Sequence, residues 1–299
     1  MKMLPFVLSV IIIFLPVSDA AALENLKKTV AVFDFENDSG YRGAVRLGND
    51  FTVQLTDALV QSGKFNVLTR EDLDIVFAEQ DLAASGRMAK STTAKKGKAI
   101  PAQILIKGKI TEFEENTSGG GQGFSIKGIS LGTKKSTASI AVIIQLIDST
   151  TGEVIDSKRV EGEARSGGLS IGYSGSFDLS SSNFKKTPLG KAVQMAIDRA
   201  VEHISKKLSK IPWKGKVVTL KEGIVFINAG ENANVQVGDT FQVLREGEAL
   251  IDPDTGIDLG SEATKLADIK VTDVQPKFSK AKIEGAAGVE IAAGDLIRE

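Results

Sequence analysis

TVAVFDF, residues 29–35, is an apolar run that ends in the polar turn 36–40, and this pattern predicts a buried β-strand. The following segment predicts an amphipathic helix, because apolar residues recur every four positions at Leu47, Phe51, Leu55 and Leu59. A short strand is expected over 65–68. A second helix then follows, with a buried face formed by Leu73, Val76 and Phe77. The order strand, helix, strand, helix is typical of an α/β domain.

Longer strands and one long helix come next. Residues 104–110 alternate between apolar and mostly basic positions, which indicates a strand. Residues 139–147 are apolar on both parities, which predicts a central strand buried on both faces. Residues 187–211 predict a helix with Thr187 as N-cap. The single histidine, His203, lies in this helix, and we interpret it as an ordinary surface residue because no second histidine could share a ligand.

The C-terminal part of the chain changes character at residues 212–215 (PWKG), which we take as a domain boundary. From Lys216 onward the chain consists of short apolar runs separated by turns, which predicts a small β-barrel or sandwich. The segment from Asp252 to Asp258 carries alternating carboxylates, as a calcium loop does. It lacks the closing Glu and the flanking helices of an EF-hand, so we interpret it as a hairpin turn.

Composition and charge exclude several function classes. The chain has 37 Lys and Arg against 38 Asp and Glu, so it lacks the basic excess of a nucleic-acid-binding protein. It has no Cys and one His, which leaves no thiolate metal site and makes a catalytic triad improbable. We therefore predict no catalytic residue, no cofactor and no metal. The carboxylate pair Asp72 and Asp74 is the alternative for an enzyme, but residues two apart on a helix do not share a face.

Residues 1–20 read as a signal peptide, with Lys2 before an apolar run and small residues at a cleavage site after Ala20. The apolar run is about 14 residues long, short of the ~20 that span a bilayer as a helix. Because the chain has no Cys, we expect an exported protein without a lipid anchor, located in the periplasm or at the outer membrane.

Two segments, 116–137 and 165–182, do not resemble ordinary globular strands. In the second segment, apolar and small polar residues alternate almost strictly from 169 to 180, as in a strand that spans a membrane within a barrel. The expected lipid-facing residues of the two segments are Phe124, Ile126, Leu169, Ile171, Tyr173, Phe177 and Leu179.

The strands around these segments fit the membrane pattern less well. The neighbouring strand, 155–165, offers only the short smooth face of Val160, Gly162 and Ala164. In the first segment, the parity of the apolar residues breaks at Lys127–Gly128, which predicts a bulge or a shift of face.

The alternative for both segments is a pair of long hairpins exposed to water. One chain supplies about four such strands, too few to close a barrel alone. The membrane interpretation therefore requires a ring of identical subunits that share one barrel.

From about residue 29 to 208, the chain resembles the curli production assembly/transport component (CsgG-type) family. The similarity is carried by residues 30–35 (VAVFDF), 65–73 (FNVLTREDL), 102–113 (AQILIKGKITEF), the glycine-rich run with Gly128, and 140–154 (IAVIIQLIDSTTGEV). The C-terminal region looks similar to the C-terminal domain of a flagellar assembly protein (FlgT-like).

The resemblance implies a periplasmic α/β domain with two long β-hairpins. In the family, subunits form a ring whose hairpins join into one outer-membrane barrel that passes unfolded curli subunits. Two departures matter. The family's lipid-bearing Cys is absent, and the constriction loop is short, about 36–46, with Tyr41 as its one aromatic residue. Tyr41 is the only constriction residue that the resemblance carries over.

Together these observations predict an α+β protein in three parts. They are a signal peptide over 1–20, an α/β domain over 21–211 with hairpins at about 110–147 and 154–186, and an all-β domain over 212–299. The expected function is a self-associating secretion or assembly component that contacts outer-membrane lipid and an unfolded secreted protein. The alternative is a soluble periplasmic scaffold for envelope or flagellar assembly, without a pore.

Overall fold

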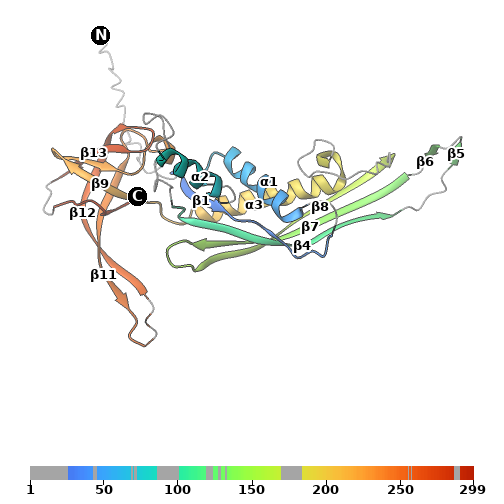
Figure 1. Cartoon of the computed structure of the whole chain (residues 1–299), viewed down its shortest axis with the longest axis horizontal. Helices are drawn as coiled ribbons and strands as arrows, with labels where there is room; N and C mark the ends of the chain where they lie inside the picture. The colour runs from blue at the N-terminus through green and yellow to red at the C-terminus, as the bar shows by residue number, and fades with distance from the viewer. Residues whose placement is uncertain are drawn as a thin grey trace, which may run out of the picture.

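A computed structural model describes two bodies, a mixed sheet with helices on one face and a closed β-barrel (Figure 1). It describes residues 26–42, 46–68, 70, 73–85, 101–118, 124–126, 129–131, 133–169, 184–254, 256, 258–285 and 290–299. The expected α+β fold class is confirmed. No helix within these ranges is both long and apolar enough to cross a membrane.

The sheet of the N-terminal domain has a parallel part and an antiparallel part. Its strand order is β3 (Phe65–Leu68), β1 (Lys28–Val32), β4 (Ile104–Ser118), β7 (Thr133–Asp148) and β8 (Val154–Leu169). The short strand β2 (Glu36–Asn37) also pairs with β4. β1 runs parallel to β3 and β4, whereas β4, β7 and β8 form an antiparallel meander.

Two helices cover one face of this sheet, α1 (Leu47–Gln61) and α3 (Pro188–Leu208) (Figure 1). The apolar stripe that predicted α1 is buried against the sheet, as is the stripe of α3. The N-cap of α3 is confirmed, because Thr187 Oγ1 accepts a hydrogen bond from the Gly190 nitrogen at 3.0 Å. A 3₁₀ turn, η3 (Phe184–Lys186), leads into this cap.

Strand β7 is central, as its sequence predicts, but it is covered by helices on one face only. Ile140, Ile144 and Leu146 are buried toward the helices, whereas Ile143 and Ile147 on the other face stay partly exposed. The expectation of burial on both faces is therefore wrong, since no helix of the described chain packs on the second face.

Helix α2 (Leu73–Ala84) forms where the sequence predicts it, but its apolar residues are not buried. Val76 and Phe77, expected in the core, are exposed, as are Ile75 and Leu82. Helical spacing therefore identified the helix correctly, but the predicted buried face is wrong.

The C-terminal domain is a closed barrel, the first of the two architectures that the sequence predicted. Its strands are β9 (Lys214–Lys221), β10 (Ile224–Ile227), β11 (Thr240–Ile251), β12 (Asp258–Val274), β13 (Ser279–Glu284) and β14 (Leu296–Arg298). The 3₁₀ turn η4 (Glu231–Ala233) follows β10. Trp213 lies in the barrel core, with its ring centroid 5.6 Å from that of Phe241. The Asp252 region is a hairpin turn as expected, because the Gly256 nitrogen donates to the Asp252 carbonyl at 2.8 Å.

Candidate functional site: the projecting strands and their base

Three strands of the sheet continue past the helix-covered core. The last buried residues that face the helices are Phe113 on β4, Ala138 on β7 and Ala164 on β8. Beyond them the antiparallel ladder runs five residues further, to Ser118 opposite Lys135 and to Leu169 opposite Thr133. At about 3.4 Å per residue this adds roughly 17 Å of ribbon. The projection points away from the barrel (Figure 1).

A separate two-stranded hairpin lies at the tip of the projection. It consists of β5 (Phe124–Ile126) and β6 (Ile129–Leu131), with Phe124 opposite Leu131 and Ile126 opposite Ile129. Lys127 and Gly128, where the sequence predicts a bulge or a shift of face, lie outside the described residues, so that expectation stays a prediction.

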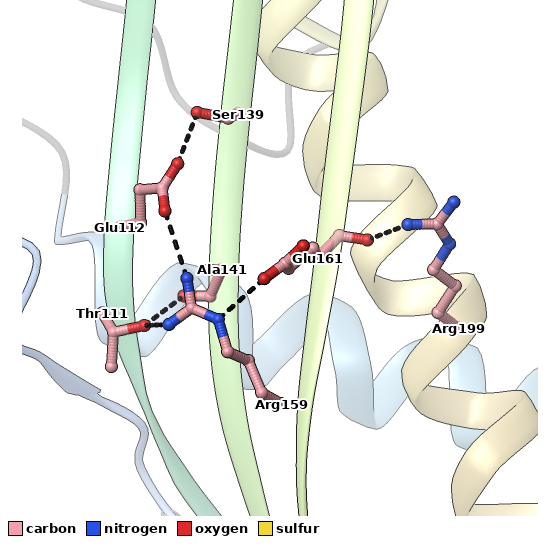
Figure 2. A network of polar contacts seen from close by, with 7 residues as sticks. All are labelled: Thr111, Glu112, Ser139, Ala141, Arg159, Glu161 and Arg199. Atoms are coloured by element: carbon pink, nitrogen blue, oxygen red, sulfur yellow. Dashed lines mark hydrogen bonds and ion pairs between the residues drawn. The ribbon is translucent and has the colours of Figure 1, made fainter.

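No described strand pairs with either edge of the projecting ribbon. β8 is the outer strand of the sheet, and β4 has no second neighbour beyond its pairing with β2 at Ile110. Arg199 of α3 donates to the Glu161 carbonyl on the outer edge of β8 (Figure 2). Edge strands present unpaired N–H and C=O groups and are therefore templates for pairing with another chain.

A guanidinium group joins the strands β4 and β8 at the base of the projection, on the face away from the helices (Figure 2). Arg159 of β8 donates to Thr111 Oγ1 at 2.8 Å, to Glu112 Oε2 at 3.1 Å and to Glu161 Oε1 at 2.8 Å. The hydrogen bond to Glu161 raises the pKa of Arg159. Arginine suits this place because its planar fork can bind several acceptors at once.

Two further contacts extend this cluster to β7. Ser139 Oγ donates to Glu112 Oε1 at 2.8 Å, and Thr111 Oγ1 donates to the Ala141 carbonyl at 3.3 Å. Ala141 is only 1% exposed although no helix covers this face. The polar cluster therefore cross-links β4, β7 and β8 where the ribbon leaves the core.

The short smooth face of β8 packs on α3 instead of facing outward. Val160, Gly162 and Ala164 are buried, and a Cβ atom at Gly162 would lie 2.8 Å from the Ala192 carbonyl carbon. The interpretation of these residues as part of a membrane-facing strand is therefore wrong. A helix can approach this closely only because glycine has no side chain.

A second polar contact holds α3 to β8. Asp156 accepts from Lys207 Nζ at 2.9 Å and lies 2.5 Å from His203 Nε2. Burial, the largest single influence, raises the pKa of Asp156, but the hydrogen bonds and charges of His203 and Lys207 together hold it below its ordinary value. His203 is thus a structural residue. Within the described ranges, no three His, Asp or Glu side chains gather as a metal site would require.

Tyr41 lies at the base of the projection. Its ring centroid is 5.0 Å from that of Phe113, in an edge-on arrangement, and its carbonyl accepts from Asn37 Nδ2 at 2.8 Å. The ring is half-buried against the core. Its assignment to a constriction stays a prediction.

The other predicted residues are placed only in part. Phe124 and Ile126 lie in β5, and Leu169 is the last residue of β8. The four remaining candidates lie outside the described residues: Ile171, Tyr173, Phe177 and Leu179. Sequence reasoning missed the Arg159 cluster, although charged residues alternate along β8 at Arg159, Glu161, Glu163 and Arg165.

Comparison with known proteins gives two family matches. A family model described as curli production assembly/transport component CsgG matches residues 17–237, and one described as the C-terminal domain of flagellar assembly protein T matches residues 222–297. The predicted resemblance is confirmed, and the first match extends beyond the expected limit at residue 208.

Individual relatives are more distant. A Neisseria meningitidis serogroup B protein whose name describes it as a lipoprotein is 27% identical over 63% of this chain and 80% of its own length. The CsgG component of Salmonella typhimurium is 28% identical over 36% of this chain, which spans 40% of that protein. A solved structure of a hypothetical protein from Chlamydia trachomatis is 16% identical, covers 60% of this chain and 96% of its own, and has a TM-score of 0.37.

Proposed function

The chain belongs to the CsgG family of curli production assembly/transport components, and from this premise we propose that its copies form a ring whose projecting strands join into one barrel. It is a CsgG-type component of the bacterial envelope. In the proposal, the ring is a non-enzymatic secretion or assembly platform at the outer membrane.

The free edges of the three-stranded ribbon carry this proposal. An isolated ribbon would have no described strand beside the outer edge of β8 or the far edge of β4 over the projecting residues. Long free edges are rare in stable monomers because they aggregate unless something covers them. Pairing with the next subunit satisfies these groups, and a closed ring leaves no edge at all.

Strand direction sets a condition on the ring. β4 and β8 run in the same direction, because each is antiparallel to β7. In a rotational ring, an all-antiparallel barrel therefore needs a fourth strand that returns from β8. We assign that strand to residues 170–183, which lie outside the described residues and hold the alternating segment. Four strands per subunit also give the even total that is usual in such barrels.

In this arrangement, outer-membrane lipid contacts the apolar residues of the two segments, which are Phe124, Ile126, Leu169, Ile171, Tyr173, Phe177 and Leu179. The small polar residues between them line a watery passage for an unfolded secreted protein. We assign Tyr41, which packs on Phe113 at the base of the ribbon, to a narrowing of that passage. In the proposal, these strands attach the ring to the membrane.

The exposed face of α2 also favours self-association. Ile75 is 68% exposed and Phe77 is 45% exposed, on a helix whose apolar residues belong to neither hydrophobic core of the described chain. Contiguous exposed apolar side chains are typical of interaction sites. We assign α2 to the contact between neighbouring subunits.

Lysine substitutions test the membrane assignment. Ile171→Lys and Phe177→Lys each place a charge on the proposed lipid face, at a cost of about 2–4 kcal/mol per subunit near the bilayer midplane. Ser176→Lys, on the other parity, is the matched control because it would face water. We expect the first two variants to leave the outer-membrane fraction and the control to stay. Equal behaviour of all three would contradict the proposal.

A soluble scaffold is the second candidate function. It is favoured by the charged residues on the described part of the ribbon, such as Glu114, Glu115 and the ion pair Arg165–Glu163. In a pore these residues form a water-exposed stalk below the membrane. In a scaffold the whole hairpin stays in water. Electron microscopy of detergent-extracted protein separates the two, because only the pore predicts rings with a barrel on one side.

A further inference from the structure

A cavity of about 590 Å³ lies where the N-terminal domain meets the barrel. Its walls come from the start of β1, the turn after α1, the last turns of α3 and Asn234 next to η4 of the barrel. The two domains touch here, since the Lys27 nitrogen donates to the Ala233 carbonyl at 3.0 Å. Such a volume is typical of a small-molecule site, about 300–1,000 Å³.

The charges around this cavity are unbalanced. Four lysines line the cavity, Lys27, Lys28, Lys64 and Lys206, whereas Glu202 is the one carboxylate among the described lining residues. Within the described chain, Lys27, Lys64 and Lys206 form no ion pair. Like charges that gather around one cavity repel each other, and an anion bound between them would relieve that repulsion.

Lys28 differs from an ordinary surface lysine because it is buried. The residue is 8% exposed, and burial lowers the pKa of its ammonium group, while the negative charge of Glu299 opposes part of that lowering. A buried charge is unfavourable unless it is paired. The dipole of α3 favours a cation in its last turn, which accounts for Lys206 but not for Lys27, Lys28 or Lys64.

We propose that this cavity binds a phosphate-bearing ligand, with Lys27, Lys28, Lys64 and Lys206 as its counter-charges. Phosphate groups carry more charge than a carboxylate does, and lysine binds them as a compact point charge. The apolar walls at Leu26, Phe65 and Leu208 suit an uncharged remainder of the ligand. A free phosphate compound and a phospholipid headgroup share this chemistry.

The first test uses the full chain and two probes. Calorimetric titration with inorganic pyrophosphate tests the free compound, and vesicles of phosphatidylglycerol against phosphatidylcholine test the headgroup. We expect saturable binding of at least one probe. Lys64→Gln should weaken it about tenfold or more, because a charge-assisted contact is lost. Lys191→Gln, an exposed lysine at the other end of α3, should change it less than about twofold.

A second variant tests whether Lys28 serves ligand binding or the stability of the fold. Lys28→Met removes the buried ammonium at similar volume, so it should raise the Tm of the ligand-free protein and still weaken binding. Absence of saturable binding of both probes at about 1 mM, or binding unchanged by Lys64→Gln, overturns the proposal. Where Lys28→Met does not fold, Lys64→Gln alone decides. The site does not involve the hairpins, so Ile171→Lys should bind the probe as the wild type does.

Discussion

Replacing Gly162 by alanine should push α3 slightly away from the base of the projecting strand and destabilise the N-terminal domain. A Cβ atom there would lie 2.8 Å from the Ala192 carbonyl carbon and 3.0 Å from the Ala196 nitrogen, and closer still to the Ala192 carbonyl oxygen. The carbon distance alone is about 0.6 Å short of the 3.4 Å at which ordinary contact begins. These atoms belong to the backbone of a helix, so no side chain can rotate away.

The cost follows from how much of α3 must move. Val193 and Ile197, on the same turns of the helix, are almost fully buried. A gap of about 0.5–1 Å forfeits a quarter to a half of a dispersion contact, and overpacking a core costs about 1–3 kcal/mol. Alanine also lowers the conformational entropy of the unfolded chain, which offsets at most about 0.4–1 kcal/mol of this loss of stability. We therefore expect Gly162→Ala to lower the free energy of unfolding by about 1–3 kcal/mol.

Urea unfolding at fixed protein concentration measures this loss of stability, and the barrel of the same molecule serves as the internal control. Circular dichroism at 222 nm reports on the N-terminal domain, because α1, α2 and α3 all lie there. Fluorescence of Trp213, the chain's one tryptophan, reports on the barrel. The urea midpoint from circular dichroism should fall in Gly162→Ala, and the midpoint from Trp213 fluorescence should move less. Glu163→Ala, on the exposed face of the same strand, should stay within about 0.5 kcal/mol. A Gly162→Ala protein as stable as the wild type would refute the close-packing argument.

Three further predictions concern the pH response, self-association and the strand cross-link. The pKa of Asp156 is held below its ordinary value, so its contribution is complete above the unfolded pKa of ~3.9 and is lost as pH falls through the lower folded pKa. Asp156→Asn should therefore cost about 1–3 kcal/mol at pH 7 and flatten the decline of the 222 nm urea midpoint below pH ~4; an unchanged slope would contradict this. Phe77→Glu should shift sedimentation velocity toward monomer with little change in the circular dichroism spectrum, and intact oligomers would remove α2 from the interface. Arg159→Lys keeps the charge but loses the planar guanidinium, so backbone amide hydrogen exchange at the base of β4 and β7 should become faster. Arg165 contacts Glu163 alone in the described chain, so the control Arg165→Lys should leave that exchange rate unchanged.

Features set by neighbours along the chain were predictable from the sequence. The stripe of α1 is buried as its four-residue spacing predicts, and Thr187 caps α3 as its position before Pro188 predicts. The central place of β7 also follows, since an apolar strand without alternating charge suits the middle of a sheet.

Features set by distant partners were not predictable in the same way. Whether Val76 and Phe77 are buried depends on what lies opposite α2, and no local pattern contains that information; in the structure both are exposed. The Arg159 contacts with Thr111 and Glu112 cross 48 and 47 positions of sequence, so they require the register of three strands.

The contacts of β8 suggest why the base of the ribbon is built more firmly than its projecting end. Within seven residues of this strand, Asp156 is held by His203 and Lys207, Gly162 lies against the backbone of α3, and Arg159 ties the strand to β4. A strand that pairs with another subunit must keep its register, since a slip of one residue turns every side chain to the other face. In a barrel, that slip would turn the lipid-facing residues toward water. Fixing β8 on both faces at its base therefore protects the register that the proposed barrel requires, and a scaffold with its hairpins in water would have much less need of it.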